Sequence, residues 1–235
     1  MMHYQTLITV LCVLGASYAA TMEEETSLNR KARDHEYLVE CDNLSYWKDI
    51  TPGHQCGECK IHGDPHVSTF DQVKFKFIGE PERYLATRVY GFDTPCDQIK
   101  IEFELVQHHN KRRHIFHKIF LIDGTETITL TRRNDGTIDT TNVPGGDQSG
   151  LDEFSYIFPN CQKIQMKFWD RALRLHIAGH SVLRGHMEGI CGIYNGEQDD
   201  DMYGSDDIKY ENQPDDFAAT WKTDGLPGHT THPDK

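Results

Sequence analysis

The chain has 235 residues and a formal net charge of −13 at pH 7, from 24 basic and 37 acidic side chains. This length allows one medium-sized domain with short appendages, and it is sufficient to bury a substantial hydrophobic core. So acidic a protein is not expected to have nucleic acids or anionic membranes as partners.

An apolar run at the N-terminus has the length and the ending of a secretory signal peptide. Residues 4–20 carry no charge and end in small residues, which predicts cleavage after Ala19 or Ala20. The stretch before the run lacks lysine and arginine, which is unusual for a signal, but the apolar core is too short for a membrane anchor. We therefore expect residues 1–20 to be a signal peptide and the protein to be secreted and extracellular, without membrane insertion.

The next segment, residues 21–33, is hydrophilic and is a candidate propeptide. It ends in Arg30-Lys31-Ala32-Arg33, which resembles the recognition site of furin-type proteases and predicts processing after Arg33. The alternative is an ordinary basic cluster in an unstructured segment. Residues 34–58 then form a cysteine-containing N-terminal extension, with a glycosylation sequon at Asn43.

A distinctive motif follows between Cys59 and Asp71. It contains Gly63-Asp64-Pro65-His66 and then Thr69-Phe70-Asp71. A zinc site at the preceding Cys56-Gly57-Glu58-Cys59 is disfavoured, because no second Cys-x-x-Cys and no suitably spaced histidine pair completes four ligands.

The middle of the chain has the two-residue period of β-strands. The expected strands are Val73–Ile78, Arg83–Tyr90, Ile99–Val106, His114–Ile122, Thr127–Thr131, Phe154–Phe158, Ile164–Trp169 and Leu173–Ile177. Turn signals such as Asp123-Gly124 and Gly145-Gly146 separate them, which predicts an all-β protein, an antiparallel β-sandwich with little helix. The expected core includes Phe75, Phe77, Ile101, Phe103, Phe168 and Leu175. Residues 214–222 are expected to form one short helix, and residues 223–235 a flexible C-terminal tail.

Charged and titratable side chains along these strands have no evident catalytic arrangement. The basic cluster Lys111-Arg112-Arg113, with Lys118, is expected at the rim of a hairpin. The 14 histidines are expected on the surface, because none lies beside a recognisable serine or cysteine nucleophile. We expect no catalytic residues and no enzymatic activity.

A glycine-punctuated acidic loop occupies residues 189–202. Glycines at 189, 192 and 196 permit tight turns, and a dense set of oxygen-bearing side chains follows: Asn195, Glu197, Asp199, Asp200 and Asp201. Hard cations such as calcium bind about six to eight oxygens, which a loop of this kind can supply. The spacing is not that of an EF-hand, and a solvated acidic loop is the alternative.

These blocks resemble the von Willebrand factor type D domain family. That family opens with a cysteine, Gly-Asp-Pro-His and Thr-Phe-Asp, and it closes with Cys-Gly-x-Tyr-Asn-Gly, acidic residues and an aromatic segment ending in Trp. Cys59–Asp71, Cys191–Gly196 and Asp216–Trp221 match in that order. The resemblance covers residues 59–222 and implies a single type D domain.

The resemblance also narrows the cysteine pairing. Without Cys12 of the signal, six cysteines allow fifteen connectivities. The family pairing implies Cys59–Cys191; Cys96 is then expected to pair with Cys161, and Cys41 with Cys56. A further family bridge is missing as a whole, because its two positions fall near Glu80 and at Glu188.

Two further site expectations come from the resemblance. The first is one calcium ion held by Asp64, Asn195, Asp200 and Asp201, with the backbone carbonyl of Glu197 and with Asp199 taking or sharing a ligand role. The second is self-cleavage between Asp64 and Pro65 in mild acid, which some members with Gly-Asp-Pro-His undergo, with His66 protonating the proline nitrogen. The alternative for this motif is a structural turn that supplies a calcium ligand.

The function implied by the resemblance is non-enzymatic. We expect a calcium-stabilised glycoprotein that acts by protein–protein interaction in the extracellular matrix, a body fluid or a secretion such as venom. The cysteine-rich modules through which larger members assemble are absent from this sequence, which predicts a monomer or weak oligomer. The alternatives are a luciferase-like secreted enzyme, a yolk-protein fragment and a toxin released from a precursor at Arg33.

Overall fold

The computed structural model describes residues 39–40, 55–92, 95–107, 114–132, 138–139, 147–150, 153–169 and 174–223. These belong to one compact unit that begins at Leu38. In the described part the secondary structure is mostly β, with one α-helix of seven residues. The signal peptide, Arg33, Cys41, Asn43 and the basic cluster 111–113 all lie outside the described residues.

The strands extend from β1 to β14. Their bounds are β1 Val39–Glu40, β2 Gln55–His62, β3 His66–Ser68, β4 Lys74–Lys76, β5 Arg83–Val89, β6 Ile99–Gln107, β7 His114–Asp123, β8 Glu126–Arg132, β9 Ile138–Asp139, β10 Asp147–Gly150, β11 Glu153–Phe158, β12 Cys161–Trp169, β13 Arg174–His180 and β14 Met187–Glu188. The helical segments are the 3-10 turns η2 Pro95–Gln98, η3 Ser181–Leu183 and η4 Gln198–Asp200, and the helix α2 Pro214–Thr220.

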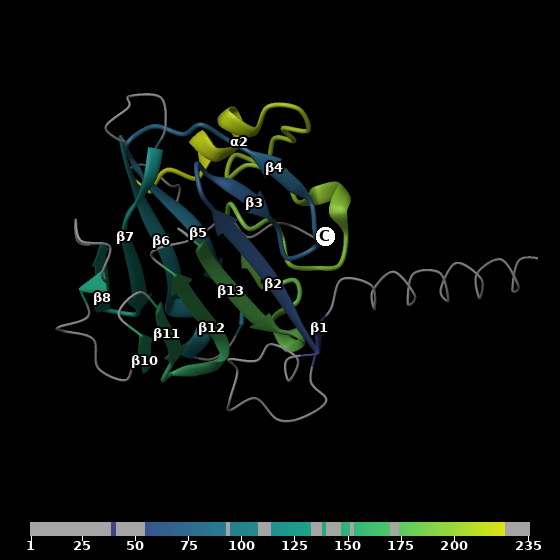
Figure 1. Cartoon of the computed structure of the whole chain (residues 1–235). Coiled ribbons are helices and arrows are strands. Elements are labelled where there is room, and N and C mark those ends of the chain that lie inside the picture. The colour runs from purple at the N-terminus through teal and green to yellow at the C-terminus, as the bar shows by residue number, and fades with distance from the viewer. Residues whose placement is uncertain are drawn as a thin grey trace, which may run out of the picture. The chain divides into compact units, whose positions relative to one another are not determined.

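The strands form two antiparallel sheets. The larger sheet has eight strands in the order β10-β11-β12-β13-β2-β3-β4, with β1 paired to β2. The smaller sheet has six strands in the order β14-β5-β6-β7-β8-β9. Figure 1 shows the strands of the larger sheet side by side, with α2 beside the edge strand β4. The expected all-β sandwich is confirmed.

Alternation along the strands of the larger sheet separates an inner from an outer face. Phe168, Leu175, Ile61, Val67 and Phe75 are register partners in successive strands and point to one side. The residues one step along each strand are mostly polar and point to the other side. This period of two places the apolar row against the smaller sheet, where the rings of Phe116 and Phe168 lie 6.2 Å apart.

The expected core is confirmed with one exception. Five of the six residues are at most 3% exposed: Phe77, Ile101, Phe103, Phe168 and Leu175. Phe75 is only partly buried, because β4 is the edge strand and has a neighbour on one side only. Its ring meets that of Phe217 from α2 edge-on at 5.4 Å, which covers part of the open edge.

The expected strands agree with the observed ones to within a few residues, but several strands were not predicted. The important omissions are β2 and β3, which flank Gly63-Asp64-Pro65-His66 and pair as a hairpin. The sequence of β2 contains two cysteines and a glycine and lacks a clear apolar alternation, so the pattern does not predict a strand there. Residues 55–58 of the expected N-terminal extension therefore belong to the central part of the larger sheet.

Candidate functional site

The acidic loop is held between the two sheets by its backbone. The N–H of Ile190 donates to the carbonyl of Leu85 at 3.1 Å, and the N–H of Cys191 donates to that of Ala86 at 3.0 Å. On its other side, the carbonyl of Cys191 accepts from the N–H of Phe70 at 3.1 Å. The C-terminal loop therefore lies between β5 and the Thr-Phe-Asp segment of the first motif.

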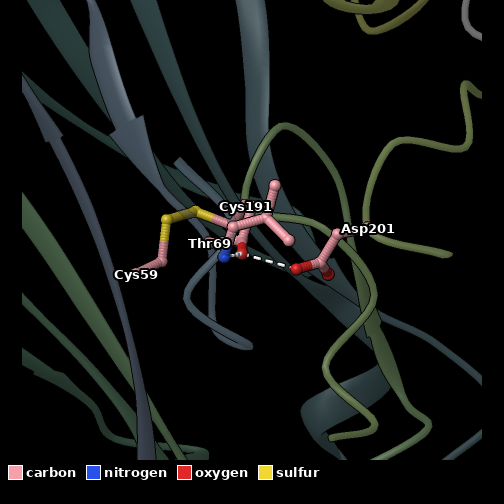
Figure 2. The surroundings of a disulfide bond; sticks show 5 residues. Cys59, Thr69, Cys191 and Asp201 are labelled. Atoms are coloured by element: carbon pink, nitrogen blue, oxygen red, sulfur yellow. Dashed lines mark hydrogen bonds between the residues drawn. A yellow bond between two sulfur atoms is a disulfide. The ribbon is translucent and has the colours of Figure 1, made fainter. Parts of the chain in front are cut away.

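A disulfide joins the same two motifs. Cys59 on β2 is bonded to Cys191, as the family pairing implies (Figure 2). Cys96 is bonded to Cys161, which links the turn before β6 to the start of β12. Cys56 is also disulfide-bonded, and Cys41, its expected partner, lies outside the described residues.

Two glycines on neighbouring strands make room for side chains near the loop, Gly57 for Tyr194 and Gly179 for Met187. Gly57 on β2 and Gly179 on β13 are register partners. A Cβ at Gly57 would overlap the Tyr194 ring, which is fully buried and lies 5.2 Å from the ring of Phe70. Close packing of this ring sets the position of the residues that follow it.

Asp71 closes the turn at Asn195 and Gly196. Its Oδ2 accepts the N–H of Asn195 at 3.1 Å and that of Gly196 at 2.8 Å. The side chain of Gln198 donates to the carbonyl of Asp71 at 2.8 Å. Asp71 is 1% exposed, so the last residue of the first motif is a buried part of the acidic loop.

Asp201 is the most buried acidic residue of the loop, with 0% exposure. Its Oδ2 accepts the hydroxyl of Thr69 at 2.5 Å (Figure 2). Its Oδ1 is buried and has no well-formed hydrogen bond among the described residues, although the backbone N–H of Ile193 lies near enough to the carboxyl to oppose the rise of its pKa. Gly192 has a φ of +77°, and a Cβ there would overlap this oxygen. A buried carboxylate oxygen without a partner carries a desolvation cost that a cation would remove.

The pKa values of the two buried carboxyls reflect this crowding. Burial raises the pKa of Asp71 to about 6, against the opposing effect of the Asn195 and Gly196 N–H groups. Burial also raises the pKa of Asp201 well above its usual value, and the charges of Asp71 and Asp200 add to this effect. Three carboxyls therefore lie close enough to repel one another in a buried site.

The structure brings together some of the expected ligands. The side-chain amide of Asn195 donates to Asp200 Oδ2 at 2.6 Å, and the Asn195 side-chain oxygen accepts the N–H of Glu197 at 2.7 Å. The side chains of Glu197 and Asp199 are exposed, and Asp199 lines a shallow surface hollow with Lys209.

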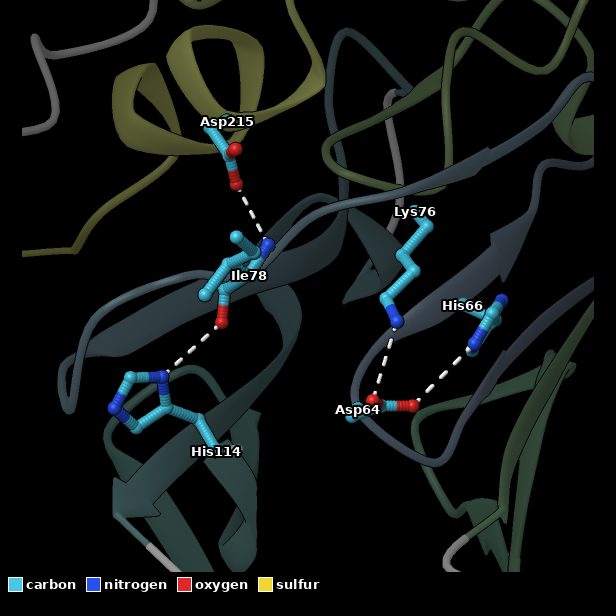
Figure 3. Close-up of polar contacts among 6 residues, drawn as sticks. All are labelled: Asp64, His66, Lys76, Ile78, His114 and Asp215. Carbon is cyan, nitrogen blue, oxygen red and sulfur yellow. Dashed lines mark hydrogen bonds and ion pairs between the residues drawn. The ribbon is translucent and has the colours of Figure 1, made fainter. Parts of the chain in front are cut away.

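Asp64 is placed differently from the expectation. Its carboxylate contacts Lys76 Nζ at 3.2 Å and His66 Nε2 at 3.4 Å, both on the strands β3 and β4 that follow it (Figure 3). Asp71, seven residues later, is the carboxylate of the first motif that reaches the loop. Asp71 is not among the expected ligands, although Thr69-Phe70-Asp71 is part of the matched motif.

The donor set suits a hard cation, although the described residues contain no group of three or more His, Cys, Asp or Glu side chains already arranged for a metal. Carboxylate and amide oxygens from Asp71, Asn195, Asp200 and Asp201 are the ligand types that calcium prefers. The oxygens of Asp71 and Asp200 now accept N–H groups of the loop. A cation would therefore be expected to replace some of these hydrogen bonds.

Glu188 occupies the position of one cysteine of the missing family bridge. It lies on β14, and its Oε1 contacts the guanidinium of Arg88 on β5 at 2.5 Å. The side chains are 5% and 13% exposed. A shielded ion pair thus connects β14 to β5 at this position.

These features define a disulfide-linked antiparallel β-sandwich in which two motifs from opposite ends of the chain are joined at one acidic loop. The family model of the von Willebrand factor type D domain matches residues 59–208. The chain therefore belongs to the von Willebrand factor type D domain family.

Similar proteins include hemocytin of Bombyx mori, with 27% identity over 174 residues, covering 69% of this chain and 5% of that protein. Zonadhesin of Sus scrofa is 22% identical, covering 70% of this chain and 7% of that protein. Mucin-6 of Gallus gallus is 25% identical, covering 77% of this chain and 15% of that protein. The matched region is thus a small part of each relative. In the described residues, no helix has the length and apolar character needed to cross a bilayer.

Proposed function

We propose that this chain is a secreted type D domain protein that binds calcium at the acidic loop and acts by protein–protein interaction outside the cell, without catalysis. The observation that supports calcium best is Asp201, which is fully buried and has an oxygen without a hydrogen-bond partner. The expected signal peptide and the mucin among the relatives support the extracellular location.

The residues proposed to hold the ion are Asp71, Asn195, Asp200 and Asp201. Bound calcium supplies positive charge that offsets the mutual repulsion of the three carboxylates. Thr69 positions Asp201 through its hydroxyl, and the backbone of the turn positions Asp71. Asp64 is not part of this set, because its contacts are with Lys76 and His66.

Calcium at this place would stabilise the link between the two motifs. The loop is bonded to Cys59, to Phe70 and to the backbone of β5 at Leu85 and Ala86. An ion that fixes the loop therefore also fixes the contact between the larger and the smaller sheet. A folded surface of defined shape is the property that a binding module needs.

The test is thermal unfolding of the purified protein with calcium and with a chelator. Calcium at about 100 times its Kd should stabilise the fold by about 2.7 kcal/mol through mass action. Asp201→Asn should lose this increase in Tm and keep the fold, because the amide oxygen can still accept the Thr69 hydroxyl. Asp64→Asn is the matched control, since it removes the same charge outside the loop, and it should keep the full response.

Two outcomes would contradict the calcium proposal. One is an identical melting curve of the unmodified protein with calcium and with chelator. The other is loss of the response in Asp64→Asn with retention in Asp201→Asn, which would return the site to the hairpin at Asp64. The interaction itself is tested by cross-linking the protein in its native fluid and identifying the extracellular proteins recovered.

A further inference from the structure

The outer face of the larger sheet carries a row of basic side chains. Register pairing across five strands aligns Lys167 on β12, His176 on β13, Lys60 on β2 and, past Ser68 on β3, Lys74 on β4. Register partners in neighbouring antiparallel strands point to the same face, so these side chains form one line across the sheet.

A second row runs parallel to the first, two residues further along each strand. It consists of Trp169, Arg174, His62, His66 and Lys76. Because side chains alternate with a period of two, the second row shares the face of the first. The indole ring at its end contacts His176 edge-on, with 4.7 Å between the ring centroids, and joins the two rows.

The charge of these rows opposes that of the whole chain. On β12, β13, β2 and β4, five Lys or Arg side chains, one of them the buried Lys167, lie with two carboxylates, Glu58 and Asp64. The rows continue in register onto β11 and β10 at Glu153 and Asp147, whereas the chain as a whole carries −13. The two carboxylates are paired: Glu58 contacts Lys60 at 2.7 Å, and Asp64 contacts Lys76. The excess is therefore positive, on a protein that is otherwise strongly acidic.

Two of the cations are available for a ligand. Lys74 and Arg174 are exposed, and neither has an acidic partner among the described residues. They lie in different rows and on different strands, with Lys60 and His62 of β2 between them. Strands are about 4.8 Å apart, so the positive charges are spread over a flat surface instead of being gathered at a point.

We propose that this face, the outer surface of β12, β13, β2, β3 and β4, binds a sulfated polysaccharide. A linear polyanion can contact both rows and release its counterions, which is the main source of affinity for such ligands. Lys and Arg suit sulfate oxygens, and the second row ends at the partly buried Trp169. An acidic protein partner is less well matched, because stable protein interfaces need several desolvated aromatic or apolar anchors and the two rows contain one aromatic residue apart from histidines.

The environment of His62 is consistent with a crowded positive surface. Burial lowers its pKa, and the charges of His66 on β3 and of Arg174 and His176 on β13 lower it further. An anion bound between these residues would remove part of that repulsion. The titration of His62 therefore serves as a local probe of the face.

The test is binding to immobilised heparin in low salt, with unsulfated dextran as the neutral control. The protein should bind heparin and not dextran, and affinity should fall steeply with added salt. Lys74→Glu combined with Arg174→Glu should weaken binding about tenfold or more, because each reversal removes a contact and adds repulsion.

A matched control separates the face from net charge. Lys74→Glu and Lys100→Glu make the same charge change at an exposed strand residue, but Lys100 lies on β6 of the other sheet. Lys74→Glu should weaken binding, and Lys100→Glu should leave it within about twofold. Circular dichroism and Tm establish that both variants fold.

Nuclear magnetic resonance gives a second measurement, in which a heparin oligosaccharide should raise the pKa of His62. The proposal is overturned if the protein does not bind heparin in low salt, or if Lys100→Glu weakens binding as much as Lys74→Glu. It is also overturned if the double variant binds heparin normally and loses self-association by sedimentation. That result would make the face an interface for the acidic loop of a second copy.

Discussion

Glu58 is 3% exposed, although it lies on β2 in the position that points away from the core. It is retained there by two hydrogen-bond donors: His176 Nδ1–H donates to its Oε1 at 2.8 Å, and Lys60 Nζ donates to its Oε2 at 2.7 Å. Burial raises the pKa of Glu58, but the hydrogen bonds from His176 and Lys60 outweigh it, so the pKa lies below the usual 4.5. A buried carboxylate at the edge of the basic rows therefore holds two of their members in place.

The first prediction concerns this contact. His176→Ala should cost roughly 1.5–3 kcal/mol near neutral pH, because it removes the donor to the buried Oε1 of Glu58 and leaves the contact with the more exposed Lys60. Since the folded pKa of Glu58 is lowered, its contribution is complete above pH 4.5 and is lost as the pH falls through the folded value. The difference between the variant and the unmodified protein in urea unfolding should therefore shrink in acid.

Lys60→Ala is the control for that experiment. Its side chain is 44% exposed, against 15% for His176, so water screens its contact with Glu58. It should cost at most about 1 kcal/mol. An equal or larger loss of stability in Lys60→Ala would contradict the role given to His176.

The second prediction concerns self-cleavage at Asp64–Pro65, which we propose for mildly acidic conditions. Attack of the Asp64 carboxyl on its own carbonyl requires a proton on the carboxyl, and the ammonium of Lys76 at 3.2 Å favours the ionised form (Figure 3). Lys76→Ala should therefore raise the cleavage rate in mild acid, up to about fivefold for an exposed pair. Chelator should not change the rate, because Asp64 is not among the residues proposed to hold calcium.

Cleavage is measured on reducing gels, since the Cys59–Cys191 bridge would hold the two fragments together. Asp64→Asn should remain intact and serves as the control. An intact chain in both the unmodified protein and Lys76→Ala would contradict self-cleavage and leave Asp64 as a structural partner of Lys76 and His66.

At the scale of elements, the loop from β14 to η4 combines glycines of positive φ with close packing. Gly189, Gly192 and Gly196 all have positive φ, and a Cβ at Gly189 would overlap the backbone of Ala86. The loop follows β5 closely because its first glycine has no side chain there. After η4, Asp201 lies against the first motif, where it accepts the hydroxyl of Thr69.

The third prediction separates backbone strain from contact with Asp201. Gly192 and Gly185 both have a φ of +77°, but a Cβ at Gly185 would meet nothing within 4 Å, whereas one at Gly192 would overlap Asp201 Oδ1. Gly185→Ala should cost about 1 kcal/mol from strain alone. Gly192→Ala should cost more and should also abolish the Tm response to calcium. The placement of Asp201 would be contradicted if Gly185→Ala and Gly192→Ala lost equal stability and both kept the increase in Tm with calcium.

At the scale of the whole molecule, the two sheets are joined at places far apart in sequence. The bonds Cys59–Cys191 and Thr69–Asp201 each connect residues 132 positions apart, and Cys96–Cys161 connects residues 65 apart. On the chain-entropy model a bridge that closes so long a loop contributes about 4 to 5 kcal/mol. Disulfide bonds persist in oxidising surroundings, and the two bridges are therefore consistent with the proposed secretion.

The fourth prediction follows from secretion. Protein isolated from its natural source should begin near Thr21 if only the signal peptide is removed, or at Asp34 if the basic segment is also cut. N-terminal sequencing distinguishes the two forms. Recovery of an intact Met1 would contradict secretion.

The sequence by itself was sufficient for the family and for most of the fold. The period-two pattern identified the long strands, and the two end motifs identified the type D domain, because both signals are local and consist of a few residues in a set order. The pairing of Cys59 with Cys191 was likewise available through the resemblance. These features depend on the order of residues along the chain.

Only the tertiary structure decided which side chains share a site. Asp64 and Asp71 are seven residues apart in one motif, and they lie on either side of β3, so that Asp64 contacts Lys76 and Asp71 reaches the acidic loop. The basic rows arise because strands from residues 55–76 and 161–180 lie side by side, which no single segment of sequence reveals. Register between distant strands is set by packing of the whole core, and for this reason the sequence could list the charged residues but not group them.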